Sequence, residues 1–200
     1  MAPITGVLFA LVAIAANSLA QASINRENPA RDENLFEAAA QKVRGLAPKS
    51  FRILPKEIAN ELERRHCQIP QDDTARQGDI TNVIHGSFFA RASSDWAVLC
   101  NEKVDSYILV FRQGDADHPS KLAPAPVINS LEGIGNDLIG YVRRITTLDR
   151  QRFAKYYALG KDRKVALTHD AISDAMSDKF ESVYYWKYDK WEVVRVHASE

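Results

Sequence analysis

Two cysteines, Cys67 and Cys100, constrain the fold of this chain more than any other feature of its sequence. A disulfide between them would close a loop of the unfolded chain and stabilise the folded state by roughly 3 to 4 kcal/mol. The alternative is a nucleophilic Cys67, with His66 or a more distant histidine as its base. Adjacent residues seldom face each other, and Cys100 offers the thiol a partner. The sequence therefore favours a structural disulfide over a nucleophile, and it lacks the close histidine pair of a zinc site.

The N-terminal segment predicts an export signal. Residues 1–22 carry no charged side chain, and the small and apolar run 6–16 has the length of a signal-peptide core rather than of a membrane span. Ala-Gln-Ala at 20–22 is a small-x-small cleavage site before Ser23. The first ionisable side chain is Arg26, so the usual basic start is missing and a retained N-terminal anchor is the alternative. Export to the periplasm or the extracellular space would place both cysteines in an oxidising compartment.

The charge balance disfavours several classes of partner. The chain holds 26 Lys plus Arg against 26 Asp plus Glu, so no overall field would hold it on nucleic acid or on an anionic membrane. Apolar residues make up 46%, which is enough to bury the core of one ordinary domain. After cleavage we expect a globular monomer with no cofactor, no nucleic-acid partner and no membrane attachment.

The first part of the mature chain predicts a linker followed by two helices. Residues 23–33 are polar, contain Pro29 and show no periodicity, which is typical of a linker. Apolar residues then keep helical spacing from Asn34 to a closing Gly45. A second helix is predicted after Pro55, because proline suits the first turn of a helix. Its apolar stripe is formed by Leu54, Ile58 and Leu62.

From Asn82 onward the apolar pattern changes to period two or to short continuous runs, which predict strands. Three such segments, at 83–89, 96–100 and 107–111, predict an antiparallel meander. The segment 112–126 contains glycine and three prolines and predicts a loop that marks an internal seam. After it we expect a strand over 140–146, a helix capped by Thr147, and a hairpin formed by 182–188 and 191–196.

These elements predict an α+β fold in a single domain over residues 34–200. Helices stand beside antiparallel strands, and no alternating βαβ pattern is present. We expect the N-terminal helices to pack beside the meander, where the bridge between Cys67 and Cys100 would hold them. A strand, a helix and the aromatic C-terminal hairpin would follow.

Several short motifs of this chain are similar to those of a group of exported bacterial proteins of uncharacterised function. The resemblance covers about two thirds of the chain and extends into its C-terminal half. The clearest motifs are Cys67, Ile69, Pro70, Gln71; Asn82, Val83, Ile84, Gly86, Phe88; and Asp95, Trp96, Ala97, Val98, Leu99, Cys100. This resemblance implies a compartment but no activity. The meander is also distantly similar to one blade of an FG-GAP propeller repeat. Its loop 90–95 offers one carboxylate, Asp95, so the likeness implies no calcium site.

Catalytic and cofactor motifs are mostly absent from the sequence. It contains no Gly-x-Ser-x-Gly elbow, no His-Glu-x-x-His and no Walker-type phosphate loop. Gly133, Gly135 and Gly140 only imitate a dinucleotide turn, because Leu138 stands at the third glycine position. Asp115, Asp117 and His118 have the ligand types of a weak ion site, but a polar turn before Pro119 explains them more simply. We therefore assign no metal site.

His169 and Asp170 are the best catalytic candidates. A histidine is a general base near neutral pH, and a carboxylate is able to orient it. Neighbouring residues rarely orient each other, however, and Asp170 also fits the N-cap of a helix over 171–176. We therefore keep these two residues as the site of the alternative function, an envelope hydrolase.

The C-terminal hairpin provides the candidate partner-binding residues Tyr185, Trp186 and Trp191. Strand alternation puts Tyr184, Trp186 and Tyr188 on one face and Val183, Tyr185 and Lys187 on the other. One face is expected to join the core, and the other would present an aromatic side chain to a partner. The alternative is a hairpin in which all these aromatics serve packing.

Three functional classes fit these features: a binding or inhibitor-like module, an envelope hydrolase, and a structural or assembly component. Because the predicted mature chain is small, disulfide-stabilised, balanced in charge and without a catalytic motif, we favour the first. The expected partner is a protein or ligand of the envelope or the extracellular space.

Overall fold

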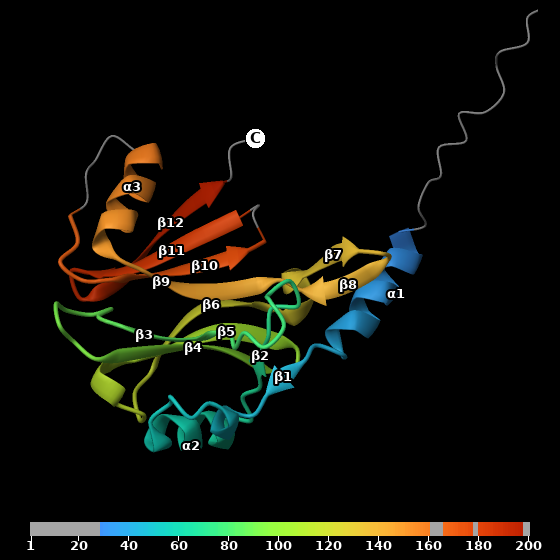
Figure 1. Ribbon diagram of the computed structural model, residues 1–200, viewed down its shortest axis with the longest axis horizontal. Helices are drawn as coiled ribbons and strands as arrows, with labels where there is room; N and C mark the ends of the chain where they lie inside the picture. The colour runs from blue at the N-terminus through green and yellow to red at the C-terminus, as the bar shows by residue number, and fades with distance from the viewer. Residues whose placement is uncertain (1–28, 161–165, 178–179, 198–200) are drawn as a thin grey trace, which may run out of the picture.

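Two four-stranded antiparallel sheets face each other in the computed structural model, which describes residues 29–160, 166–177 and 180–197 (Figure 1). The first sheet has the order β3-β4-β5-β6, with β3 at Val83–Gly86, β4 at Asp95–Glu102, β5 at Asp105–Phe111 and β6 at Ser120–Pro126. The second has the order β12-β11-β10-β9, with β9 at Arg143–Leu148, β10 at Ala171–Met176, β11 at Phe180–Lys187 and β12 at Lys190–His197.

The predicted α+β class is therefore wrong, because the chain has a β-rich fold. Within the described ranges it holds four antiparallel sheets and only three short α-helices, which are α1 (Pro29–Ala40), α2 (Lys56–Arg64) and α3 (Arg150–Gly160). The two smaller sheets are two-stranded antiparallel pairs, β1 (Gly45–Leu46) with β2 (Ile69–Pro70) and β7 (Leu131–Gly135) with β8 (Leu138–Tyr141). The strands pair with each other in two layers, and the helices lie outside them.

The two sheets and two of the helices form four layers (Figure 1). Helix α2 covers the outer face of the first sheet, and α3 covers that of the second. Along β4, Ala97 and Leu99 face the second sheet, whereas Val98 and Cys100 face α2. Burial on both faces explains why β4 and β5 are continuous apolar runs in the sequence.

Helix α1 and the β7–β8 pair lie together at one end of the sandwich (Figure 1). This helix begins at Pro29, inside the segment predicted to be a linker, and ends before the predicted Gly45. Three short 3₁₀ turns complete the described elements, at Pro48–Ser50, Arg112–Gly114 and Val127–Ser130. The predicted signal peptide, residues 1–22, lies outside the described residues.

Two further local predictions differ from the structure. The segment 112–126, predicted to be a loop, contains strand β6, which tolerates Pro124 and Pro126 because it lies at the edge of its sheet. Thr147 belongs to β9, and the carboxylate of Asp149 caps α3 instead, accepting the backbone N–H groups of its first turn. Other elements are confirmed, including α2 after Pro55 and the C-terminal hairpin.

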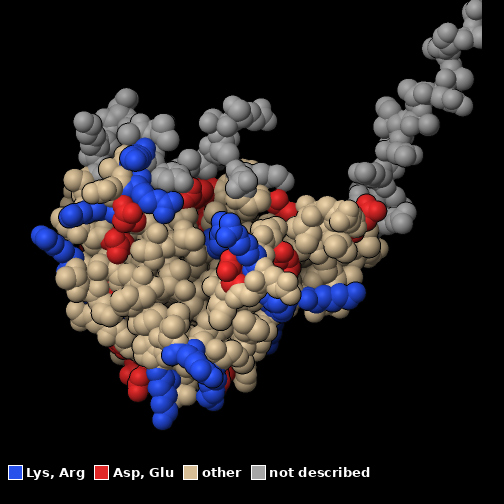
Figure 2. Space-filling view, in the orientation of Figure 1, with Lys and Arg blue, Asp and Glu red and all other residues tan. Residues whose placement is uncertain are grey.

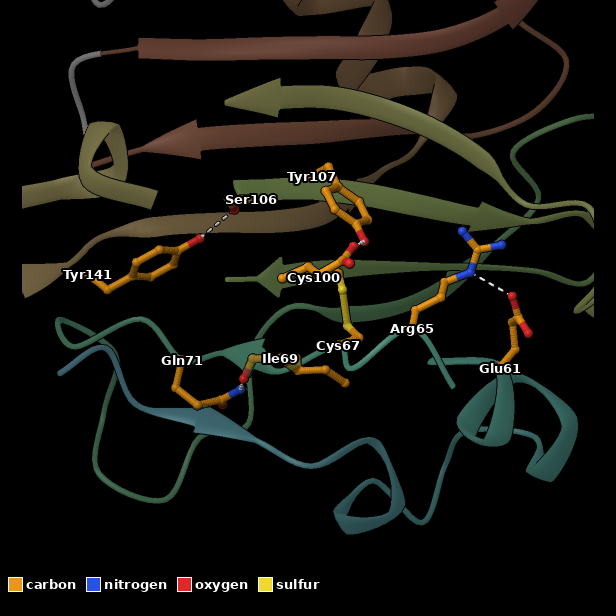
Figure 3. Close-up of a disulfide and its surroundings, with 10 residues drawn as sticks. Glu61, Arg65, Cys67, Ile69, Gln71, Cys100, Ser106, Tyr107 and Tyr141 are labelled. Carbon is orange, nitrogen blue, oxygen red and sulfur yellow. Dashed lines mark hydrogen bonds and ion pairs between the residues drawn. A yellow bond between two sulfur atoms is a disulfide. The ribbon is translucent and has the colours of Figure 1, made fainter. Parts of the chain in front are cut away.

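The predicted disulfide is present and buried (Figure 3). Cys67 lies just after α2 and Cys100 lies on β4, with 5.4 Å between their Cα atoms and a sequence separation of 33. Both side chains belong to the core between α2 and the first sheet. The bridge therefore fastens α2 to the sheet. The other N-terminal helix, α1, was also predicted to pack beside the meander, but it contacts β7 and β8 instead.

Removing this bridge should destabilise the fold. For Cys67→Ala combined with Cys100→Ala, we expect the free energy of unfolding to fall by about 3 kcal/mol, because the unfolded chain regains the entropy of an open loop. Urea unfolding of the oxidised chain and of the double variant measures the difference. Reduced wild-type protein is the control and should resemble the variant; equal stability of oxidised and variant protein would contradict the structural role.

Tyr107, beside the disulfide on β5, is buried and donates a hydrogen bond from its hydroxyl to Glu102 Oε2 at 2.7 Å (Figure 3). The Nζ of Lys121 lies 3.7 Å from the centre of its ring. Burial raises the pKa of Tyr107 to about 12, and the Glu102 carboxylate adds to this shift because it accepts the hydroxyl proton in a hydrogen bond.

This raised pKa predicts a loss of stability at alkaline pH. An unfolded tyrosine ionises at about pH 10, whereas Tyr107 in the folded protein ionises at about pH 12. Between these pH values the folded state binds more protons than the unfolded state, so the stabilisation present below pH 10 is lost as the pH rises. We expect the loss of unfolding free energy between about pH 9 and pH 11 to be about 1 kcal/mol smaller in Tyr107→Phe than in wild type. Urea unfolding at both pH values tests this, and equal losses would refute it.

Candidate functional site

A cavity of about 470 Å³ opens between the two sheets, and we call it the inter-sheet cavity. The side of the sandwich opposite to it is closed, because β3 and β9 contact each other there. Side chains and backbone from both sheets line the cavity: Ala123, Pro124, Ala125, Asn129, Ser130, Arg143, Asp174, Met176, Phe180, Ser182, Tyr184 and Arg195. Its volume lies in the range of small-molecule sites.

A buried ion pair forms the base of the cavity. Arg143 on β9 and Asp174 on β10 are 3% and 9% exposed, and the guanidinium donates to both carboxylate oxygens, from Nε at 2.8 Å and from Nη2 at 2.9 Å. This bidentate geometry is the strongest form of the arginine–carboxylate contact. The pair lies on the inward face of the sheet, where the neighbouring inward residues are Ile145 and Ile172.

The polar network continues from Arg143 into the first sheet. Its Nη1 donates to the hydroxyl of Ser106 at 3.1 Å, and that hydroxyl lies 3.2 Å from the Tyr141 hydroxyl. Its Nη2 also donates to the backbone oxygen of Ala123 at 3.0 Å. Ala123 has a φ of 50°, in the left-handed region that alanine seldom occupies. The guanidinium thus holds a strained residue of edge strand β6 at the wall of the cavity.

Ser130 belongs to the residues that line the cavity, but its hydroxyl is buried inside the protein and does not face the cavity. The Tyr141 hydroxyl lies beside it. Burial raises the pKa of Tyr141. The Ser130 hydroxyl therefore belongs to the buried wall of the cavity and not to the surface that a ligand would contact.

The second sheet arranges the remaining polar groups in rows across neighbouring strands. Asp174, Ser182 and Arg195 stand directly opposite one another on β10, β11 and β12. Tyr184 follows on the same face of β11, and burial raises its pKa, with the Asp174 carboxylate raising it further. Arg195 is exposed and forms no ion pair with any residue in the described ranges. It lies at the mouth of the cavity, opposite the buried ion pair.

His169 and Asp170 lie in a separate, more open cavity near the start of α3. The Asp170 carboxylate accepts the N–H of Ser87 at 2.9 Å, and the Asp170 N–H donates to the Ser87 carbonyl at 2.7 Å. His169 Nδ1 lies 2.9 Å from the backbone oxygen of Asp170. Residues 171–176 form strand β10, so Asp170 does not cap a helix there. It instead ties the two sheets together, and these two side chains do not form a dyad.

The aromatic residues predicted to bind a partner all contact the core. Tyr185 is 6% exposed and packs against Phe153 of α3, with 5.1 Å between ring centres. Trp186 and Trp191 are half-buried and pack on Phe89, at 5.0 and 5.2 Å. Trp186 and Trp191 are therefore the two with accessible area, and partner binding through them stays a prediction.

The weak ion-site candidate is a polar turn. Asp115 Oδ1 accepts the N–H of Asp117, and Asp115 Oδ2 lies 3.3 Å from His118 Nδ1. The backbone N–H of Asp117, with a smaller contribution from His118, lowers the pKa of Asp115. No group of three potential metal ligands occurs within the described residues. Nor does any helix in the described ranges have the length and apolarity needed to cross a membrane.

Positive and negative side chains are interspersed on the face shown in Figure 2, with an uncharged area between them. This face therefore has no single-signed patch of the kind that steers macromolecular polyanions.

Sequence reasoning missed the inter-sheet cavity and its ion pair. One signal was present, because strand alternation places Arg143 on the face of Ile145 and Asp174 on the face of Ile172. Two opposite charges on core-facing positions indicate a buried pair.

Comparison with protein-family models, with curated proteins and with solved structures found no match for this chain. Its function must therefore be inferred from the geometry of the site.

Proposed function

We propose that this chain is an exported, non-catalytic binding module whose ligand site is the inter-sheet cavity. The observation that carries the proposal is the buried Arg143–Asp174 pair at the base of a cavity that both sheets line. A charged pair in a β-sandwich core costs desolvation free energy, and hydrophobic residues often replace such pairs without loss. Its position at an open cavity supports a role in recognition.

The disulfide supports export, since a bridge of this kind persists in oxidising compartments. The uncharged segment 1–22 supports it as well. A non-catalytic role is supported by the arrangement at Asp170, whose carboxylate binds a backbone N–H of Ser87 instead of orienting His169. The hydrolase alternative has no comparable support from the geometry.

A matched pair of tryptophan variants tests the proposal. Ala125 lines the inter-sheet cavity, so Ala125→Trp would fill it, whereas Ala47 is exposed on the α2 side of the chain and Ala47→Trp would not. The oxidised wild type and both variants are immobilised and exposed to an envelope extract, and bound molecules are identified by mass spectrometry. Wild type and Ala47→Trp should retain one component that Ala125→Trp loses.

Two results would overturn the proposal: capture of no component by the wild type, or equal capture by the filled variant. His169→Asn provides a further control, because a module that binds through the cavity should retain its ligand in this variant. Folding of each variant is checked by the coincidence of its urea unfolding transition with that of the wild type.

A further inference from the structure

The charges that line the inter-sheet cavity leave room for one negative charge on a ligand. Arg143 and Asp174 neutralise each other through their bidentate contact, and Arg195 adds a single positive charge at the mouth. A ligand with one carboxylate would complete this balance. A multiply charged phosphate group would meet the Asp174 carboxylate at the base of the same cavity.

The hydrogen-bonding groups of the cavity favour a ligand with several hydroxyls. Each Asp174 oxygen accepts one bond from Arg143 and has capacity for another donor. Ser182 and Tyr184 also line the cavity, and a hydroxyl group both donates and accepts. A long aliphatic chain would leave these groups unpaired.

The rows of the second sheet also set the spacing of these groups. Asp174 and Arg195 flank Ser182 across three adjacent strands, so about 10 Å separates their backbones, twice the distance between neighbouring strands. A single six-membered ring placed over Ser182 would direct hydroxyls toward Asp174 and a carboxylate toward Arg195. Phe180 is 52% exposed and lines the same cavity, where an aromatic ring offers an apolar surface to the C–H face of a sugar.

We propose that the inter-sheet cavity binds an acidic sugar of the uronic-acid type. This inference rests on the proposed function and gives it a ligand class. Asp174 and the Ser182 hydroxyl would bind the hydroxyls of the sugar, Arg195 would bind its carboxylate, and Phe180 would cover one face of its ring. Arg143 acts as a positioning residue, because it orients the Asp174 carboxylate.

Isothermal titration of the oxidised chain with glucuronate, glucose and acetate tests this inference. We expect glucuronate to bind with a dissociation constant of about 1 mM, ordinary for a ligand of this size, and glucose and acetate to bind at least tenfold more weakly. Arg195→Gln should weaken glucuronate binding about tenfold and leave glucose binding unchanged. Arg52→Gln is the matched control, an exposed arginine outside the cavity.

Each other outcome overturns the inference. Acetate binding as tightly as glucuronate would define a simple anion site, and glucose binding as tightly would define a neutral sugar site. Absence of glucuronate binding, or binding that survives Arg195→Gln, would exclude the assigned contacts. The proposed function would still stand if Ala125→Trp abolished capture of an envelope component, so failure of the ligand class and failure of the binding module are distinguishable.

Discussion

Replacing Asp174 by alanine is expected to lower the free energy of unfolding by about 4 kcal/mol. The substitution leaves the guanidinium of Arg143, 3% exposed, without the carboxylate that accepts two of its hydrogen bonds. Removing one partner of a buried pair exposes the desolvation cost of the other, whereas removing both does not. Urea unfolding at neutral pH measures the effect.

Neighbouring residues provide the controls for this experiment. Arg143→Met combined with Asp174→Ala should recover at least half of the lost free energy, because no buried charge then remains unpaired. Arg144, the next residue of β9, points the other way and is 50% exposed. It lies 3.7 Å from the buried carboxylate of Asp72, which keeps its hydrogen bonds from the N–H and the hydroxyl of Thr74 when Arg144 is replaced. Arg144→Met should therefore cost less than about 1 kcal/mol. If Asp174→Ala also cost less than about 1 kcal/mol, the prediction would be wrong. Water would then solvate Arg143 and Asp174, and the two would not form a buried ion pair.

The sequence predicts those helices and strands whose own residues show a clear hydrophobic pattern. Helix α2 has a narrow apolar stripe, and its three buried side chains, Ile58, Ala59 and Leu62, face the first sheet. Strands β4 and β5 are apolar on both faces because each face is covered. The C-terminal hairpin closes through Tyr188 and Asp189, which both have a positive φ, as in a type I′ turn.

The elements that sequence reasoning missed obtain their conformation from their neighbours. Residues 171–176 contain one β-branched residue, Ile172, and suggest a helix, yet they form a strand paired on both sides by β9 and β11. Local propensity is weak compared with two ladders of backbone hydrogen bonds. Strand β6 contains two prolines and is possible only at an edge. The pairing of β10 with β9 spans helix α3 in the sequence, so local patterns do not reveal it, and this contributed to the wrong α+β prediction.

The candidate site, like the fold, depends partly on the local sequence pattern and partly on how the strands pair. Alternation places Arg143 and Asp174 on inward faces, but only the register of β9 against β10, with Arg143 opposite Met176 and Ile145 opposite Asp174, makes them diagonal neighbours. Register depends on how whole strands pair, and a single sequence does not specify it. The disulfide could be predicted because two cysteines allow only one intramolecular pairing.

Asn82→Ala is expected to lower the free energy of unfolding by about 4 kcal/mol, close to the loss predicted for Asp174→Ala. Asn82 is 1% exposed and joins three parts of the chain at the closed side of the sandwich. Its Oδ1 accepts the N–H of Ile145 at 3.0 Å, and its Nδ2 donates to the carbonyls of Pro70 at 2.8 Å and Arg143 at 3.2 Å. Its φ of 70° adds a strain of about 1 kcal/mol for alanine.

Two further variants separate the hydrogen bonds from the strain. Asn82→Gly accepts the positive φ and should be about 1 kcal/mol less destabilising than Asn82→Ala, while it still lacks all three bonds. Asn136, in the exposed β7–β8 turn with a φ of 52°, is the matched control, and Asn136→Ala should cost only about 1 kcal/mol. Equal losses in Asn82→Ala and Asn136→Ala would show that strain alone matters. A larger loss of unfolding free energy in Asn82→Ala than in Asn136→Ala would instead show that the hydrogen bonds of Asn82 stabilise the closed side of the sandwich. The Arg143–Asp174 pair faces the opposite, open side.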